Sequence, residues 1–219
     1  MERKFSVIIP TMLRCVDITN NLLDNLYDDP QVSEVIIIDN TEDPINIEKI
    51  HLHEKVQIHS QGKNIYVNPA WNLGVSIAKE DFIAIINDDI TIPERIFTSL
   101  AQIDLSTVGI LGGCFATIEK VEKPVRFTIK EASIAAISER TWAFGIFMVM
   151  HKDHYITIPE DMKVWCGDDY LYHQNRIMGR TNHLMIIPIQ TRMSTTSDDP
   201  AFDIVKNNDV EIYNSKYKV

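Results

Sequence analysis

Two pairs of adjacent aspartates are the residues of this sequence best suited to chemistry. Asp88 and Asp89 follow Asn87 at the end of an apolar run, and Asp168 and Asp169 lie in the segment "VWCGDDYLYHQNRIMGR". Carboxylate oxygens are ligands that Mg²⁺ and Mn²⁺ prefer, and these ions often take only one or two carboxylates, with water and substrate phosphates supplying the rest. A carboxylate within hydrogen-bonding reach of a hydroxyl can act as a general base. The first pair therefore suggests a cation site and the second a general base.

Each pair also has a structural explanation. Asp88 and Asp89 are suited to a turn before the helix that Pro93 begins. Asp168 and Asp169 are suited to the N-terminus of the helix that follows them, where carboxylates cap amides and complement the helix dipole. The local sequence leaves both explanations open, so the elements around each pair must decide between them.

The first half of the chain alternates short apolar runs with helical patterns. Strands are predicted at 5–10, 34–39, 55–60 and 81–88, and helices at 17–27 and 68–80. Strands that are apolar on both faces and alternate with helices predict a parallel sheet covered on both sides. Ligands bind such sheets at the carboxyl ends of the strands.

Polar residues follow these predicted strands at that edge. Thr11 and Arg14 come after the first strand, Asp39 and Asn40 after the second, and the group 87–89 after the fourth. Because parallel strands end at one edge, these residues are expected to converge. The convergence favours the cation site over the simple turn.

The second half has a different pattern. A helix is predicted at 92–103, strands at 108–118, 125–129 and 142–150, a helix at 168–179 that Gly179 closes, and a further apolar run at 184–189. Residues 194–200 are typical of a loop, and 211–219 of a flexible or docking tail. Because no linker divides the chain, a single domain over 1–219 is expected, with a mixed sheet in its C-terminal half.

Composition narrows the class of protein. With 219 residues, 45% of them hydrophobic and a net charge of −10, the chain is typical of a globular protein and does not favour a surface that binds polyanions over a broad area. The three cysteines are scattered and lack metal-ligand spacing, which favours a reducing compartment and no zinc site. No apolar run approaches the ~18 residues that cross a bilayer, and the N-terminus is no secretory signal, so a cytoplasmic location is expected.

Several common sites are excluded by their motifs. The sequence contains no G-x-x-x-x-G-K-[ST] loop, G-x-G-x-x-G turn, G-x-S-x-G elbow, H-E-x-x-H helix or C-x-x-C pair. A nucleotide bound to the predicted sheet would therefore need its phosphates held by something other than a glycine-rich loop. A cation is the obvious substitute.

The ordered pieces of the chain resemble glycosyltransferases of the GT-A fold, in particular the inverting family 2. The matching pieces are "SVIIPTMLR", "EVIIIDN", "GKNIYVNPAWNLGVSIAKEDFIAIINDD", "VGILGGCF", "FGIFMVMHKDHY" and "WCGDDYLYHQNRIMGR". They span about residues 5 to 190, and their order and spacing carry the resemblance. It implies a Rossmann-like α/β/α sandwich with a nucleotide-sugar-binding half at about 1–105, an acceptor-binding half at about 106–195 and a tail at about 196–219.

The resemblance also implies roles for individual residues. Asp39 would accept a hydrogen bond from the nucleotide base. The segment 87–89 would be the D-x-D-type motif, with Asp89 as the first metal ligand and Asp88 as the second, for Mn²⁺ or Mg²⁺. The donor would further be lined by Pro10, Thr11, Arg14, Asn64, Asn72, Asn87 and Asp88, with Gly74 in the same family segment as Asn72.

The "WCGDD" segment resembles the W-G-x-E-D segment of inverting relatives. By that resemblance Asp169 would be the catalytic base and Asp168 an acid that orients the acceptor, with Trp165 and Gly167 at the acceptor. Two positions depart from the family pattern. Asn87 replaces the first acid of D-x-D, and the stretch with Thr191, Met193 and Ser194 offers no histidine where relatives often carry a metal ligand.

The expected function is therefore transfer of a sugar from a nucleotide-sugar to an acceptor hydroxyl with inversion. A GT-A-like domain that binds a nucleotide-sugar or a partner without catalysis is the main alternative. A nucleotidyltransferase is less favoured, because no glycine-rich, lysine-bearing N-terminal loop is present. A glycan or lipid-linked acceptor is the family default. A modified DNA base is also considered, because "KVEKPVRFTIK" at 120–130 could contact phosphates, although a solvated edge strand is favoured there.

Overall fold

The computed structural model describes residues 3–42, 48–192 and 199–218. The strands are β1 (Phe5–Thr11), β2 (Val32–Asp39), β3 (Val56–Ser60), β4 (Phe82–Ile86), β5 (Ile90–Thr91), β6 (Val108–Gly113), β7 (Ile118–Lys120), β8 (Ser133–Ile137), β9 (Phe147–His151), β10 (Thr181–Ile186) and β11 (Ile189–Thr191). The helices are α1 (Val16–Tyr27), α2 (Val67–Ile77), α3 (Ile96–Leu100), α4 (Gly167–Ile177) and α5 (Asp203–Ile212), with short helical turns η2 (Phe115–Thr117), η3 (Phe144–Ile146), η4 (Lys152–His154), η5 (Pro200–Phe202) and η6 (Tyr213–Tyr217).

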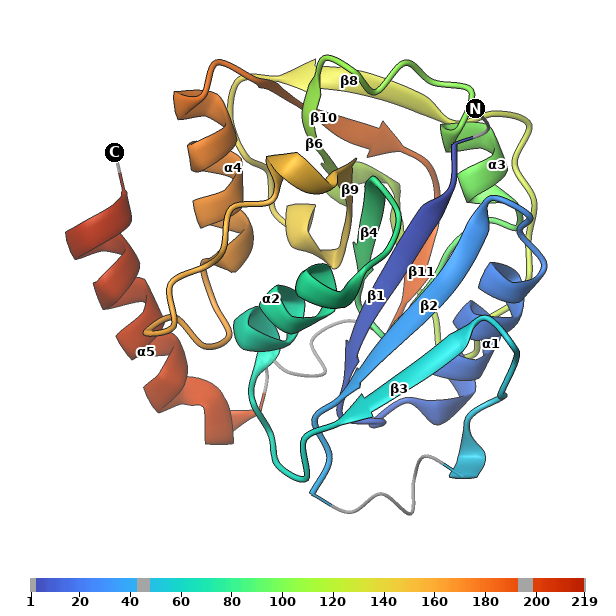
Figure 1. Cartoon of the computed structure of the whole chain (residues 1–219), viewed down its shortest axis with the longest axis horizontal. Helices are drawn as coiled ribbons and strands as arrows, with labels where there is room; N and C mark the ends of the chain where they lie inside the picture. Colours follow the sequence, from blue (N-terminus) through green and yellow to red (C-terminus); the bar gives the residue numbers. More distant parts are fainter. Residues whose placement is uncertain (1–2, 43–47, 193–198, 219) are drawn as a thin grey trace.

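In the described part of the chain, the central sheet has eight strands in the order β3-β2-β1-β4-β9-β6-β10-β8 (Figure 1). β1 to β4 run parallel to one another, whereas β9 is antiparallel to β4 and β8 is antiparallel to β10. A second sheet of three strands has the order β5-β11-β7. The predicted architecture, a mostly parallel sheet with a mixed C-terminal half, is confirmed.

Helices cover both faces of the central sheet, as the doubly apolar strands predicted. Along β1, Val7 and Ile9 are buried in one cluster with Leu22 of α1, whereas Ile8 is buried in another with Trp71 of α2. Successive side chains of a strand point to opposite faces, so a continuous apolar run supplies two cores at once. The sheet is thereby fixed as a rigid base for the residues at its carboxyl edge.

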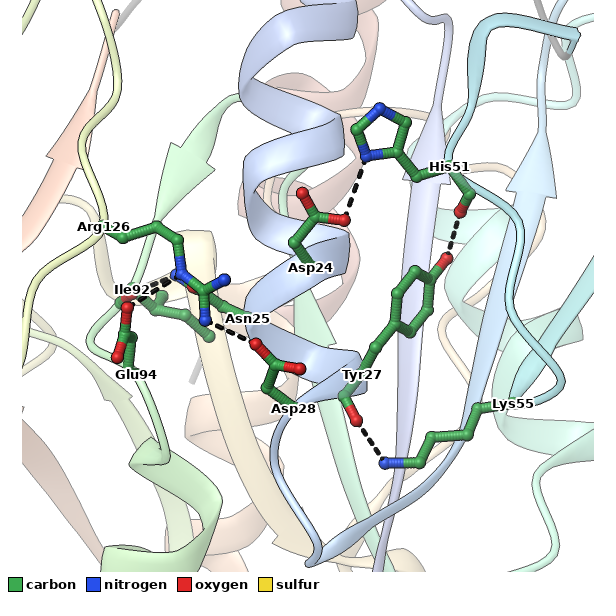
Figure 2. A network of polar contacts seen from close by, with 9 residues as sticks. All are labelled: Asp24, Asn25, Tyr27, Asp28, His51, Lys55, Ile92, Glu94 and Arg126. Carbon is green, nitrogen blue, oxygen red and sulfur yellow. Dashed lines mark hydrogen bonds and ion pairs between the residues drawn. The ribbon is translucent and has the colours of Figure 1, made fainter.

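The C-terminal end of α1 is held against two loops by polar contacts (Figure 2). Tyr27 Oη donates to the His51 carbonyl at 2.6 Å, and Lys55 Nζ donates to the Tyr27 carbonyl at 2.8 Å. On the other side of the helix, Arg126 pairs with Asp28 at 2.6 Å and with Glu94 at 2.8 Å. Arg126, the arginine of the stretch considered for phosphate contacts, is therefore already paired with two carboxylates.

The strands and helix predicted between 92 and 150 are partly wrong. Residues 125–129 form no strand, because their backbone groups bind a loop and a side chain instead. The Phe127 carbonyl accepts from Glu94 N at 2.8 Å, and Val125 N donates to the Gln190 side chain at 3.3 Å. The strand of this region is β8. The predicted strand 108–118 ends at Gly113, and 142–150 begins with the turn η3 before β9. The helix predicted at 92–103 is reduced to α3 because Arg95 before it has a left-handed φ of 56°.

Of the two alternatives for the C-terminal segment, a flexible or a docking tail, its described part fits the docking one. Residues 203–212 form α5, which continues into η6 and ends beside α4 (Figure 1). Asp209 and Tyr213 are buried there, and Tyr213 Oη pairs with Nδ1 of His173 on α4. The predicted loop 194–200 lies largely outside the described residues. Among the helices that are described, none is long and apolar enough to span a membrane.

Candidate functional site

A cavity of about 530 Å³ lies at the carboxyl ends of β1 and β4. It is lined by the following residues predicted for the site: Pro10, Thr11, Arg14, Asn64, Asn87, Asp88, Asp89, Trp165 and Asp168. The cavity therefore brings together residues that lie more than 150 positions apart in the sequence. This juxtaposition is what the convergence of strand ends predicted for the first half, now extended to Asp168 of the second aspartate pair.

The first aspartate pair is built onto the end of β1. Thr11 Oγ1 donates to Asp88 Oδ2, and Leu13 N donates to Thr11 Oγ1 at 2.8 Å. Thr19 Oγ1, on α1, donates to the Asp88 carbonyl at 3.0 Å. Asp89, next in the chain, is buried with 7% of its surface exposed. Asp88 is thus held in place by the hydroxyls of two threonines, and Asp89 is buried rather than exposed at a turn.

The electrostatic environment of this pair is unfavourable to its full negative charge. Burial, followed by the charge of Asp89, raises the pKa of Asp88 to about 7, although the Thr11 hydroxyl and the Arg14 charge both act to lower it. Two adjacent carboxylates that resist simultaneous ionisation would gain from a divalent cation. No group of three or more His, Cys, Asp and Glu side chains suited to a metal ion occurs in the described ranges. Asp88 and Asp89 supply hard oxygen donors of the kind that Mg²⁺ and Mn²⁺ accept together with substrate and water.

The second pair lies in the first turn of α4. The helix N-cap is Cys166, which has a left-handed φ of 60° and makes no side-chain capping hydrogen bond. Arg140 contacts both carboxylates: Nη2 lies 3.1 Å from Asp168 Oδ2, and Nε lies 2.8 Å from Asp169 Oδ1. A Cβ on Gly145 would lie 2.8 Å from Asp168 Oδ2, so this glycine leaves the space in which Asp168 lies. The pair is therefore oriented by an arginine from a distant loop in addition to any effect of the helix dipole.

The environment of Asp169 changes the pKa of its side chain. Burial and then the neighbouring charge of Asp168 raise its pKa to about 6, while the Arg140 charge acts in the opposite direction. A carboxylate with this pKa is mostly ionised at neutral pH and is a stronger base than an ordinary aspartate. The Asp169 side chain is 27% exposed. Asp168 lines the cavity, whereas Asp169 does not.

The C-terminal segment supplies another wall of the cavity. Phe202 and Lys206 line it, with Lys206 Nζ 5.5 Å from the centre of the Trp165 ring. Asp209, one turn further along α5, is fully buried and accepts backbone N–H groups of residues 163–165 at 2.7 to 3.0 Å. α5 thus fixes the loop that carries Trp165.

Arg14 is the cation at the other end of this wall. Its guanidinium pairs with Asp199 at 2.8 Å and lies 5.5 Å from the centre of the Phe202 ring. In the described part of the chain, no ion pair joins Lys206 to a carboxylate, which makes Lys206 the cavity-lining cation whose charge is least offset. A buried or half-buried cation in a cavity is suited to an anionic ligand.

Besides Asp169, four of the residues implied by the resemblance do not line the cavity. Asp39 is fully buried, and its Oδ1 accepts from Thr41 N at 2.8 Å and Thr41 Oγ1 at 2.6 Å, while Asn40 beside it reaches the cavity. Asn72 Nδ2 donates to the Ile158 carbonyl at 2.9 Å, and its Oδ1 accepts from Ile158 N at 3.0 Å and from Tyr155 Oη at 2.7 Å.

The remaining two are glycines in tight packing. A Cβ on Gly167 would lie 2.1 Å from Asn68 Oδ1, and one on Gly74 would lie 2.3 Å from Ile8 Cγ2. Both allow a helix to approach its neighbour closely. Thr191, on the stretch where a histidine ligand is absent, lines the cavity, whereas Met193 and Ser194 lie outside the described residues.

The sequence did not single out several residues that the structure places here: Asn40 as a lining residue, and Arg140, Trp142, Phe202 and Lys206. Arg140 and Trp142 lie between β8 and η3, and the other two belong to the segment expected to be a tail. The "WCGDD" pair was itself a signal that a positive partner was needed, but it gave no indication of which arginine would provide it.

A model of the family described as Glycosyl transferase family 2 matches residues 6–154, and the chain belongs to that family. Its structure is similar to the S. aureus TarS fragment 1–349, with 18% identity, a TM-score of 0.59, and coverage of 98% of this chain and 67% of that one. It is also similar to the mannosyltransferase PcManGT from Pyrobaculum calidifontis in complex with GDP-Man and Mn²⁺, with 14% identity, a TM-score of 0.63, and coverage of 100% and 66%.

A second TarS 1–349 structure, in complex with UDP-GlcNAc, has 19% identity and a TM-score of 0.60, and the chain covers 68% of it. The chain spans about two thirds of the length of these structures and 40% of a longer TarS chain. These likenesses confirm the GT-A fold. No match is found among curated proteins.

Proposed function

We propose that this chain transfers a sugar from a nucleotide-sugar to an acceptor hydroxyl with inversion of the anomeric carbon. The observation that supports it most is the meeting of Asp88, Asp89 and Asp168 in one cavity at the carboxyl edge of the sheet. Asp169, next to Asp168 on α4, pairs with Arg140, which lines the same cavity. Membership of a glycosyltransferase family supports the same reaction class. The first half would hold the donor and the second half the acceptor.

The donor would be held by residues of the first half and of α5. Asp39 has a buried Oδ2 without a hydrogen-bond partner in the described structure, which supports it as an acceptor for the nucleotide base, next to Asn40. Arg14 and Lys206 would face the diphosphate, since both are cations lining the cavity. Pro10 and Asn64 would complete the wall beside the nucleoside. Asn72 would act indirectly, through its bonds to the Ile158 backbone.

Asp89 and Asp88 would hold a divalent cation, Mn²⁺ or Mg²⁺, as the raised pKa of Asp88 and the hard oxygen donors support. Such a cation would supply charge stabilisation for the leaving diphosphate. The mannosyltransferase PcManGT, which has the same fold, was solved with Mn²⁺ and GDP-Man. Thr11 would keep Asp88 oriented toward the cavity through its hydroxyl.

Asp169 would act as the base and Asp168 would orient the acceptor. The acceptor hydroxyl loses its proton to the Asp169 carboxylate as its oxygen bonds to the anomeric carbon. The bond from that carbon to the diphosphate oxygen breaks, and its electron pair leaves with the nucleoside diphosphate. Attack from the side opposite the leaving group inverts the configuration. Trp165 and Gly167 would shape the acceptor side, Trp165 as a cavity wall and Gly167 by letting α4 pack against Asn68.

Calorimetric titration of nucleotides and nucleotide-sugars, with and without Mn²⁺, tests this proposal when combined with an assay of donor cleavage. The expected result is cation-dependent binding of at least one nucleotide-sugar and slow release of its nucleoside diphosphate. If no nucleotide-sugar binds under either condition, the proposal is wrong.

A non-catalytic nucleotide-sugar-binding domain is the second candidate. Asn87, which lines the cavity where an acid is usual, is the observation that favours it, because a neutral amide contributes less to cation binding. This candidate predicts donor binding without any release of nucleoside diphosphate.

For the location of the protein, the three free cysteines support a reducing compartment such as the cytoplasm.

A further inference from the structure

Phe115 and Trp142 form an exposed aromatic pair, here called the aromatic rim. The side chains are exposed to 51% and 57%, and their ring centres lie 4.6 Å apart with the ring planes at 83°. Trp142 also lines the cavity. Large aromatic side chains that are more than half exposed and paired with each other at the mouth of a cavity are typical of a binding surface.

The rim is held in place by the end of β6. A Cβ on Gly112 would lie 2.3 Å from the Phe144 ring, and one on Gly113 would lie 2.8 Å from the Ala143 carbonyl oxygen. These two glycines therefore let residues 143–144 pack directly on the strand. Since Phe115 follows the same strand and Trp142 precedes Ala143, both rings extend from backbone that is packed at the end of β6.

The rim lies beside the proposed catalytic carboxylates. Arg140, two residues before Trp142, contacts Asp168 at 3.1 Å and Asp169 at 2.8 Å. One short loop thus carries both the arginine that orients the base and the aromatic ring at the cavity wall. A molecule resting on Trp142 would have its polar groups next to Asp168 and Arg140.

The chemistry of this surface selects the kind of molecule. A hexopyranose ring has an apolar C–H face and a polar edge, which matches a flat ring flanked by charged hydrogen-bonding groups. A lipid chain would need a larger continuous apolar patch. A DNA strand would need several unpaired cations, whereas Arg140 is already paired with two carboxylates and the chain carries a net charge of −10.

We propose that Phe115 and Trp142 form an acceptor subsite that binds the C–H face of a hexopyranose ring. This inference rests on the proposed function and adds to it the two residues that hold the acceptor ring. The rim orients the sugar so that a hydroxyl on its edge faces the second aspartate pair. Trp142 gives the larger stacking face, and Phe115 supports it edge to face.

The test uses ¹⁵N-indole NMR of the full chain, which has three tryptophans. The probes are methyl glycosides of glucose, mannose and N-acetylglucosamine, up to 100 mM, added after the nucleoside diphosphate. A hydroxymethylated DNA oligonucleotide and a phosphatidylglycerol–phosphatidylcholine vesicle are the other probes. The Trp142→Phe variant assigns the Trp142 signal. The expected result is a saturable shift of that signal with at least one glycoside and none with the DNA or the vesicle.

Variants then test the rim itself. In the variants, binding is measured by saturation-transfer NMR of the glycoside itself, because two of them lack the Trp142 signal. Trp142→Ala should weaken binding of that glycoside by about tenfold or more and Phe115→Ala by a smaller factor, while Trp142→Phe retains part of it. Leu52→Ala, which removes another exposed apolar side chain that does not line the cavity, is the control and should change nothing. Nucleotide-sugar binding by calorimetry should stay within twofold in all four variants.

Three outcomes overturn the subsite: no glycoside shifts the Trp142 signal, Trp142→Ala binds the glycoside as well as the parent chain does, or only the DNA or the vesicle shifts the signal. Nucleotide-sugar binding by the parent chain separates this failure from failure of the proposed function. A parent chain that binds a nucleotide-sugar but no glycoside contradicts the subsite alone, whereas one that binds no nucleotide-sugar contradicts the function.

Discussion

Arg140 Nε lies 2.8 Å from Asp169 Oδ1, while Nη2 of the same guanidinium lies 3.1 Å from Asp168 Oδ2. A single arginine from the loop before η3 therefore bridges two adjacent carboxylates at the start of α4. The positive charge of Arg140 acts to lower the pKa of Asp169, and the ion pair fixes the direction in which Asp169 points. Arg140 thereby connects Asp168, which lines the cavity, to Asp169, which is the proposed base.

Removing this bridge should leave a smaller fraction of Asp169 ionised at pH 7. In Arg140→Ala, Asp169 loses its positive neighbour and keeps its negative one, so its pKa should rise and its orientation should relax. We expect the rate of sugar transfer at pH 7 to fall by about 10- to 100-fold, which is less than the ~10²- to 10⁴-fold typical of a complete general acid–base contribution, because the base itself remains. Arg140→Lys should recover only part of the rate, because a lysine cannot bridge two carboxylates as a planar guanidinium does.

The matched measurement for these variants is donor affinity, which should be unchanged because Arg140 contacts the second aspartate pair and not the first. A variant that loses donor affinity as much as rate would show that Arg140 acts on the donor instead.

The rate should depend on pH through Asp169. Its pKa is raised to about 6, and only the deprotonated carboxylate can accept a proton. The value of kcat/KM should therefore rise about tenfold per pH unit below pH 6 and level off above it. Initial rates between pH 4.5 and 8.5 at constant ionic strength check this. A flat profile across pH 5 to 7 would rule out Asp169 as the base.

Asp88 should cost stability at alkaline pH when no divalent cation is present. Its folded-state pKa of about 7 lies above the ordinary value of 3.8, so the fold favours the protonated form. The stability from this group is present below pH 4 and is lost as the pH rises through 7. In EDTA at pH 8, Asp88→Asn should raise Tm, by about 2–4 °C for each kcal/mol regained.

Thermal unfolding at pH 4 and pH 8 measures this effect, since the difference in Tm between parent and variant should vanish at the lower pH. Addition of MnCl₂ at pH 8 should raise Tm of the parent chain and leave Asp88→Asn nearly unchanged. An equal response of both proteins to Mn²⁺ would contradict a cation site at Asp88.

Lys206 should contribute to binding of the diphosphate. Lys206→Ala should weaken binding of the cognate nucleoside diphosphate about tenfold, which corresponds to about 1.4 kcal/mol, and leave binding of the uncharged nucleoside unchanged. Lys216→Ala is the control, because Lys216 lies on the same C-terminal segment but pairs with Asp161 at 2.8 Å and does not line the cavity. Equal losses in both variants would indicate a general charge effect rather than a contact.

Much of the first half follows from sequence periodicity. The strands β1, β2 and β4 are continuous apolar runs buried on both faces, so their place in a parallel sheet and the edge at which Thr11 and Asp88 meet could be predicted. The second half resisted the same reasoning because its positions depend on tertiary contacts. Asp29, distant in the sequence, accepts the N–H groups of Phe97 and Thr98 and thereby defines the first turn of α3.

The candidate site was predictable only where its residues follow strands or form a motif. Arg140 lies in a loop without periodicity, and its role depends on the ion pairs that it forms after folding. The sequence of α5 is polar enough to read as a tail. It is a packed helix because Asp209 accepts three backbone amides of the loop carrying Trp165, a partnership that no local pattern reveals.

The central claim is that Asp169 is the base of a sugar transfer. The most direct test compares the parent chain with Asp169→Asn, using the nucleotide-sugar found by calorimetry and measuring both its binding and the release of its nucleoside diphosphate in the presence of acceptor. We predict that Asp169→Asn binds the donor with an affinity within about threefold of the parent chain and shows no detectable transfer. Transfer by Asp169→Asn at the parental rate would contradict this mechanism.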